Sequence, residues 1–156
     1  MDAKAASSYS EMLSSVDGVI ICTPNSSHCS LALDAMKRGK HFLLEKPLGV
    51  SEKECLELAL LSRDYATTKM VGVTNRFSPL VKRAKEYMER MGRVYSIVAS
   101  TGRNRLSDPN IPLEWRMKRD LSGSGALCDF GSHLLDLSHY LSEKSMRVSQ
   151  LFPLLS

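Results

Sequence analysis

The 156-residue sequence contains no hydrophobic run long enough to cross a membrane. Apolar runs such as those at residues 19–22 and 42–44 have the length of a β-strand and fall far below the roughly 18 to 20 residues of a membrane helix. The first residues also lack the basic patch and apolar core of a secretory signal. We therefore expect a cytoplasmic protein with no membrane partner.

Cysteine is scarce, and its spacing suggests no cross-link. The cysteines at positions 22, 29, 55 and 128 form no CxxC pair, and a chain of this length can bury a core without disulfides. We expect reduced, mostly buried thiols. The nearest group of potential ligands, Cys22, His28 and Cys29, lacks the second pair that a zinc site needs, so the sequence predicts no metal.

Aromatic residues make up only 6% of the chain, and the net charge of +4 is small. The positive excess is local, because residues 76–120 hold 11 basic and 5 acidic side chains. A basic region of this kind can meet nucleic acid or a phosphorylated ligand, but it has neither an interleaved aromatic platform nor a recognisable nucleic-acid module. We expect no nucleic-acid partner.

Strand-like and helix-like segments alternate along the chain, which is typical of βαβ units and a parallel sheet. The first strand is a continuous apolar run, so we expect it to be covered on both faces. Residues 102–124 lack periodicity and predict a long loop, of the kind that often carries function. The pattern predicts strands at residues 17–23, 41–44, 70–74 and 94–100, and helices at about residues 27–38, 51–67, 79–91 and 126–141.

Polar residues follow the first three predicted strands, at residues 23–28, 45–47 and 75–77. Ligands of a parallel sheet lie beyond the carboxyl ends of its strands, so these residues are candidates for a binding site. Each group alone is better explained by capping and turn chemistry than by a binding site. Their occurrence after three successive strands favours a site.

Lys46 is the sharpest of these candidates, because it stands between a strand end and a proline and has little freedom to swing into solvent. A lysine at this edge can donate a hydrogen bond to a substrate hydroxyl and favour its ionised form. The alternative is a surface ammonium group paired with Glu45.

Asp129 and His133 are four residues apart on the last predicted helix and therefore share one face, which Asp136 and Tyr140 continue. A carboxylate beside an imidazole forms an acid/base pair in which the carboxylate can hold the ring in one tautomer. The alternative is a solvated helix face with a stabilising Asp–His pair.

Residues 123–128, with the sequence GSGALC, approach the dinucleotide fingerprint GxGxxG/A. That fingerprint must directly follow a strand and open a helix inside a βαβ unit, whereas these glycines follow residues 118–122 of the predicted loop. We interpret them as the flexible entry to the last helix. No phosphate-binding turn occurs elsewhere in the sequence.

Several motifs, in this order, resemble the glucose–fructose oxidoreductase and inositol dehydrogenase family, called Gfo/Idh/MocA. Their order and spacing fit the family across residues 7–142. The motifs are TPN at residues 23–25 with His28, AMKRGKH at 35–41, EKPL at 45–48, NRF at 75–77, LEWR at 113–116 and GSGALCDFGSHLLD at 123–136.

The resemblance implies an α/β fold, in which a partial Rossmann domain with a parallel sheet and flanking helices runs into the start of an open-sheet α/β catalytic domain. Residues 1–76 would be the C-terminal part of an NAD(P)-binding domain that lacks its first βαβ unit, and residues 77–156 an incomplete catalytic domain. Full-length relatives are expected to be homo-oligomers.

The resemblance also implies an NAD- or NADP-dependent oxidoreductase that transfers hydride between the cofactor and a sugar or cyclitol hydroxyl or ketone. The alternative is a non-catalytic truncated relative that acts as a protein-binding or regulatory domain. Because the family's glycine-rich turn is missing from the sequence, we expect the chain as given to bind NAD(H) weakly or not at all.

Family roles can be carried over residue by residue. Lys46 would orient and acidify the substrate hydroxyl, Asp129 would bind and orient the substrate, and His133 would be the acid/base. The cofactor-binding positions implied by the resemblance are Thr23, Pro24, Asn25, His28, Glu45, Lys46, Pro47 and Asn75, with Arg76, Trp115 and Arg116 on the neighbouring cofactor or substrate surface.

Overall fold

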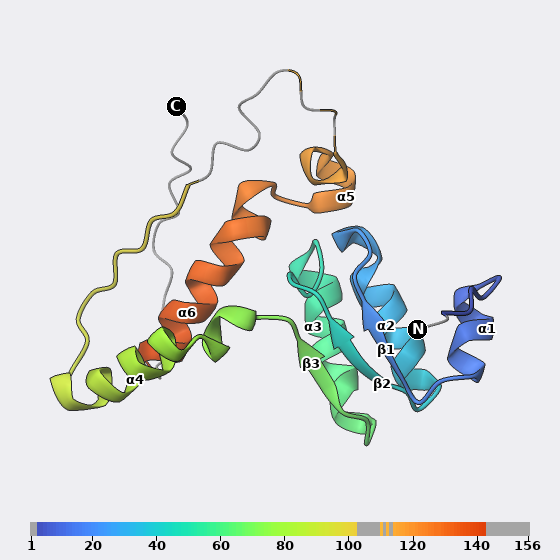
Figure 1. Cartoon of the computed structure of the whole chain (residues 1–156), viewed down its shortest axis with the longest axis horizontal. Helices are drawn as coiled ribbons and strands as arrows, with labels where there is room; N and C mark the ends of the chain where they lie inside the picture. Colours follow the sequence, from blue (N-terminus) through green and yellow to red (C-terminus); the bar gives the residue numbers. More distant parts are fainter. Residues whose placement is uncertain (1–2, 103–109, 111, 113, 143–156) are drawn as a thin grey trace.

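A computed structural model describes residues 3–102, 110, 112 and 114–142 (Figure 1). The strands β1 (Gly18–Ile21), β2 (His41–Leu44) and β3 (Lys69–Val71) form one parallel sheet in the order β1-β2-β3. The predicted α/β class, with a parallel sheet and flanking helices, is confirmed. Within the described part of the chain, no helix is both long and apolar enough to span a membrane.

The two crossovers between strands are helical and begin and end near the predicted signals. The 3-10 turn η1 (Asn25–Ser27) leads from β1 into α2 (His28–Lys37), and Gly39 follows that helix with a φ of +69°. Such a φ favours glycine because it has no β-carbon. The helix α3 (Glu52–Leu61) begins at a complete capping box and continues into the 3-10 turn η2 (Ser62–Asp64).

The core lies on one face of the sheet. Because the strand order is sequential, right-handed crossovers place α2 and α3 on the same face. The buried core side chains come from the sheet, from these two helices and from α1 (Tyr9–Ser14), a short helix that the sequence reading did not include. They are Leu13, Val19, Ile21, Cys29, Ala32, Ala35, Met36, Phe42, Leu44 and Leu58.

The opposite face of the sheet is open in the described structure. Ile20 pairs with Leu43, which pairs with Met70, and these side chains form an apolar row across the three strands. They are 71%, 37% and 43% exposed. The expectation that the first strand is covered on both faces is therefore wrong for the described residues, because both crossover helices lie on the other side.

The rest of the described chain is helical or extended. After the 3-10 turn η3 (Thr74–Phe77), the helix α4 (Pro79–Met91) lies beside α6 (Ser132–Ser142) (Figure 1). The 3-10 turn η4 (Trp115–Met117) precedes α5 (Arg119–Ser122), and a single π-helical turn, η5 (Leu127–Gly131), leads into α6.

The predicted strand at residues 94–100 is wrong. This segment joins no sheet in the described structure, and Tyr95 and Val98 are 85% and 93% exposed. Strand propensity alone does not make a strand, because the backbone N–H and C=O groups need a partner strand to complete a ladder. None of the described segments supplies that partner.

The one-sided core predicts different costs for two neighbouring leucines. We expect Leu44→Ala to lower the free energy of unfolding by about 3 kcal/mol, because Leu44 is fully buried. Leu43→Ala is the matched control on the open face and should cost about 1 kcal/mol or less. Urea denaturation followed by circular dichroism gives both values, and equal losses would contradict a one-sided core.

Candidate active site

Lys46 follows the end of β2, and its side chain reaches Asp129 in the turn that precedes α6. Its Nζ donates to the Asp129 carboxylate at 2.5 Å and to the Asp129 carbonyl oxygen at 2.6 Å. The lysine side chain is only 15% exposed. Among the described residues, the ammonium group pairs with Asp129 and not with Glu45, whose carboxylate accepts the backbone N–H of Lys46 at 3.2 Å. The structure thus favours the buried lysine over the surface ammonium paired with Glu45.

His133 lies one turn beyond Asp129, at the start of α6. Its Nδ1 is buried and has no hydrogen-bond partner among the described residues, so it donates no hydrogen bond to the Asp129 carboxylate. Asp129 is instead engaged by Lys46. Burial lowers the pKa of His133, the positive charge of Lys46 lowers it further, and nearby carboxylates oppose the shift. The neutral ring, which can accept a proton, is favoured.

Arg76, in η3 just beyond β3, is bound to α6. Its Nε donates to Oδ2 of Asp136 at 2.8 Å, and its Nη2 donates to Oδ1 of the same carboxylate. The guanidinium carbon lies 5.3 Å from the centroid of the Tyr140 ring. This two-point pairing ties the end of β3 to the helix that carries His133.

Asn25 makes a third connection of the same kind. Its side chain is 6% exposed, and its Nδ2 donates to the carbonyl oxygen of Ser122 at 2.9 Å, which joins η1 to the end of α5. Ser122 is not among the predicted site residues, and no local signal in the sequence indicates a contact between residues 97 positions apart.

A cavity of about 520 Å³ opens beside Asp129 and is also lined by Arg116, so two predicted site residues face the same space. The Arg116 guanidinium carbon lies 4.4 Å from the centroid of the Trp115 ring, and its Nη1 lies 3.5 Å from a carboxylate oxygen of Glu114. The glycines of the 123–128 segment also line the cavity and form the entry to the last helix, as expected.

His28 begins α2 and is 1% exposed. Its Nδ1 lies 2.7 Å from the carbonyl oxygen of Pro47, and its Nε2 lies 2.9 Å from the carbonyl oxygen of Thr23. The other predicted cofactor positions that follow the strands also lie at the carboxyl edge of the parallel sheet. Their roles stay predictions. They are Thr23 and Pro24 after β1, Glu45 and Pro47 on either side of Lys46, and Asn75 in η3.

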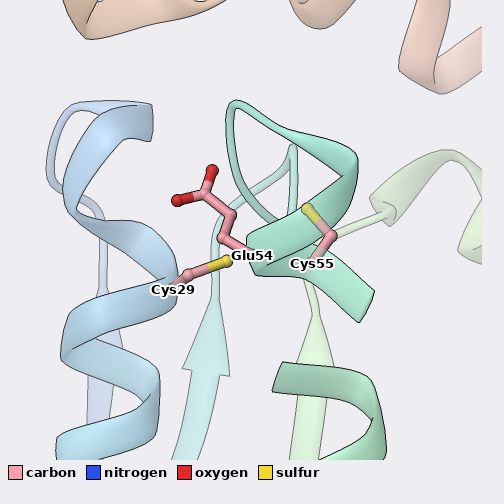
Figure 2. Close-up of side chains that lie close together, drawn as sticks. All are labelled: Cys29, Glu54 and Cys55. Atoms are coloured by element: carbon pink, nitrogen blue, oxygen red, sulfur yellow. The ribbon is translucent and has the colours of Figure 1, made fainter. Parts of the chain in front are cut away.

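Cys29, Glu54 and Cys55 form a cluster that the sequence reading did not predict (Figure 2). Their potential ligand atoms lie within 4.8 Å of one another. The Glu54 carboxylate already accepts the N–H groups of Val50 and Ser51. Burial, as the largest cause, raises the pKa of Cys29 to about 12, which favours the thiol over the thiolate that binds metals. Packing and capping account for this cluster.

All four cysteines are free thiols, and their burial differs from the expectation. Only Cys29 is buried, whereas Cys55 and Cys128 are partly buried and Cys22 is exposed.

Two family models match the chain and together cover most of it. Residues 1–73 match a model described as an oxidoreductase family with an NAD-binding Rossmann fold. Residues 81–152 match the GFO/IDH/MocA C-terminal domain.

Curated relatives are similar over most of this chain. Levoglucosan dehydrogenase from Pseudarthrobacter phenanthrenivorans is 37% identical over 79% of this chain and 32% of the relative. The rhizopine catabolism protein MocA from Rhizobium meliloti is 30% identical over 81% of this chain and 38% of the relative. The chain thus spans about a third to two fifths of the length of these relatives.

Solved structures share the fold. A levoglucosan dehydrogenase in complex with NADH and levoglucosan has a TM-score of 0.79 and 32% identity, covering 87% of this chain and 38% of that protein. An oxidoreductase domain protein from Kribbella flavida has a TM-score of 0.78 and 32% identity, covering 88% of this chain and 38% of that protein.

The charge of Lys46 is expected to influence the titration of His133. Replacing the lysine with methionine removes a cause that lowers the pKa of His133, so this pKa should rise. NMR titration of a histidine-labelled chain measures the change. His139, at an exposed position of the same helix, is the internal reference. A His133 pKa that does not change in Lys46→Met would contradict the proximity of the two groups.

The pairing of Arg76 with Asp136 should be measurable by a double-mutant cycle. We expect a coupling free energy of about 1 kcal/mol between Arg76→Gln and Asp136→Asn, a modest value because the arginine side chain is 37% exposed. Chemical denaturation of the two single variants and the double variant gives the coupling. Additive effects would show that the two side chains do not stabilise each other.

Proposed function

Because the chain belongs to the GFO/IDH/MocA oxidoreductase family, we propose that it supplies active-site residues of an NAD- or NADP-dependent oxidoreductase. The reaction would transfer hydride between the cofactor and a hydroxyl or ketone of a sugar or cyclitol. The observation that carries this proposal is the contact of Lys46 with Asp129, close to His133, beyond the carboxyl end of a parallel strand.

The names of relatives support the substrate class. Besides levoglucosan dehydrogenase, a glucose-6-phosphate 3-dehydrogenase from Bacillus subtilis is 27% identical over 90% of this chain and 41% of the relative. Both names describe dehydrogenases of sugar derivatives. We extend to this chain only the shared chemistry, the oxidation of a secondary alcohol on a sugar or cyclitol ring.

We assign residues 1–76 to the nucleotide-binding domain and residues 77–156 to the catalytic domain. The two matched family models support this division, because one ends at residue 73 and the other begins at residue 81. The 3-10 turn η3, which follows β3 and precedes α4, lies at the proposed boundary.

The described residues fit the nicotinamide end of the cofactor. Residues from η1, from the turn after β2 and from η3 share the carboxyl edge of the sheet, where nucleotides bind in this fold class. Gly123 follows α5 and not a strand, so residues 123–125 are no substitute for a phosphate-binding turn. A bound nicotinamide would supply the hydride acceptor or donor.

Residues of this chain would transfer the proton of the substrate hydroxyl. The Lys46 ammonium group would donate a hydrogen bond to the reacting oxygen of the substrate and favour its ionised form. Asp129 would hold the lysine in place, as it does in the structure, and contact the substrate. Burial lowers the pKa of His133, which favours the neutral ring. This ring would accept the proton of the hydroxyl during oxidation and return it during reduction.

The test uses the complete reading frame that contains this chain. We expect Lys46→Ala and His133→Ala each to lower kcat by at least about 100-fold, the usual loss when acid/base catalysis is removed. The affinity for NADH should change by less than about twofold. Turnover is followed by the absorbance of the reduced nicotinamide, with NAD and NADP each tested against a panel of sugars and cyclitols. The controls are Lys53→Ala and His139→Ala, both at exposed positions.

Near-normal turnover in either active-site variant would remove that residue from the proposed mechanism. Cofactor binding without turnover of any sugar or cyclitol would contradict the proposed activity and favour a non-catalytic role.

A further inference from the structure

We propose that His28 is a positioning residue that fixes the turn carrying Lys46, a role that rests on the function proposed for Lys46. The His28 ring is buried between two strand ends. Its Nδ1 lies 2.7 Å from the Pro47 carbonyl oxygen, directly after Lys46, and its Nε2 lies 2.9 Å from the Thr23 carbonyl oxygen, beyond β1. One side chain therefore bridges the turns that follow β1 and β2.

The chemistry of the two contacts separates this role from ligand binding. A carbonyl oxygen only accepts hydrogen bonds, so each contact needs a proton on the ring nitrogen that faces it. Both bonds form at once only when both nitrogens carry protons, and a ring with one proton serves one carbonyl. In either state, both nitrogens face the backbone, and neither is directed at a cofactor or substrate.

The next residue of α2 reinforces the same turn. The Cys29 thiol donates to the carbonyl oxygen of Leu48 at 3.3 Å. A β-carbon added to Gly49 would lie 2.6 Å from this sulfur, so glycine is what allows the turn to pass so close to α2. Figure 2 shows Cys29 facing α3. Glu54, in the first turn of α3, accepts a hydrogen bond from the backbone N–H of Ser51 at 2.8 Å. Residues 47–51 are thus held from both helices.

The position of Lys46 depends on this attachment. Its backbone is joined directly to Pro47, and its Nζ must stay within hydrogen-bond distance of Asp129. A shift of the turn by about 1 Å would break that geometry, and displacements of this size are enough to impair catalysis. Of the two His28 contacts, the one to Pro47 should therefore matter more for Lys46.

Two conservative variants separate the contacts. The side-chain amide nitrogen of Asn lies near the position of Nδ1, so His28→Asn keeps a donor for Pro47. The longer Gln places its amide nitrogen near Nε2, so His28→Gln keeps a donor for Thr23 alone. The readout is the rate at which acetic anhydride acetylates Lys46, measured by peptide mass spectrometry in the 156-residue chain, with the exposed Lys53 as internal reference.

We expect His28→Gln to raise the acetylation rate of Lys46 relative to Lys53 by about fivefold to tenfold, the effect of losing one hydrogen bond. His28→Asn should raise it by less than about twofold. Unchanged rates in both variants, or an equal rise in both, would overturn the proposal, because a merely structural role predicts no difference between them.

A second pair of variants keeps the test decisive if a His28 variant fails to fold by circular dichroism. Cys29→Ala removes the donor to Leu48, whereas Cys29→Ser retains one. Only the alanine variant should expose Lys46 to acetylation, and equal rates in both would count against the attachment of this turn to α2.

The readout needs neither cofactor nor substrate. If the variants show the predicted acetylation pattern but the protein has no dehydrogenase activity, the proposed function is contradicted and the attachment of the Lys46 turn to α2 is not. Normal activity without the pattern would contradict the attachment alone.

Discussion

The ion pair between Lys46 and Asp129 is the contact on which the geometry of the candidate site depends. It joins residues 83 positions apart, and it keeps a largely buried ammonium group from being left without a counter-charge. The net stability of such a pair is small, because desolvation offsets most of the attraction, whereas loss of one partner is costly. Its main effect is therefore on position: it fixes where the end of β2 meets the turn that begins α6.

The other long-range contacts follow the same plan. Asn25 beyond β1, Lys46 beyond β2 and Arg76 beyond β3 each bind the segment that runs from α5 to α6. Because parallel strands end at one edge of the sheet, three contacts spaced across that edge fix the orientation of the segment as well as its distance. The residues of the candidate site are thereby positioned by the parallel sheet.

The parts of this arrangement that depend on local chemistry could be predicted from the sequence. The Ser51 capping box, the proline that begins α4 and the polar residues at the strand ends all occur where the pattern placed them. The open face of the sheet and the unpaired segment at residues 94–100 could not be predicted in this way. Both depend on whether another segment of the chain covers the sheet or pairs with the extended segment. The partners of Asn25 and Arg76 lie 97 and 60 positions away, and no periodicity encodes such a pairing.

The same lysine charge acts on both groups of the proposed reaction. A positive charge beside a substrate hydroxyl favours the loss of its proton. Burial lowers the pKa of His133 and the charge of Lys46 lowers it further, which favours the neutral ring that can receive a proton. Asp129 limits the second effect, because its negative charge raises the pKa of His133. If the lysine stood alone, its charge would make the imidazole a weaker base. In the proposed site, pairing it with Asp129 would keep the donor beside the substrate oxygen and would limit the loss of basicity in the ring, because the carboxylate raises the pKa of His133.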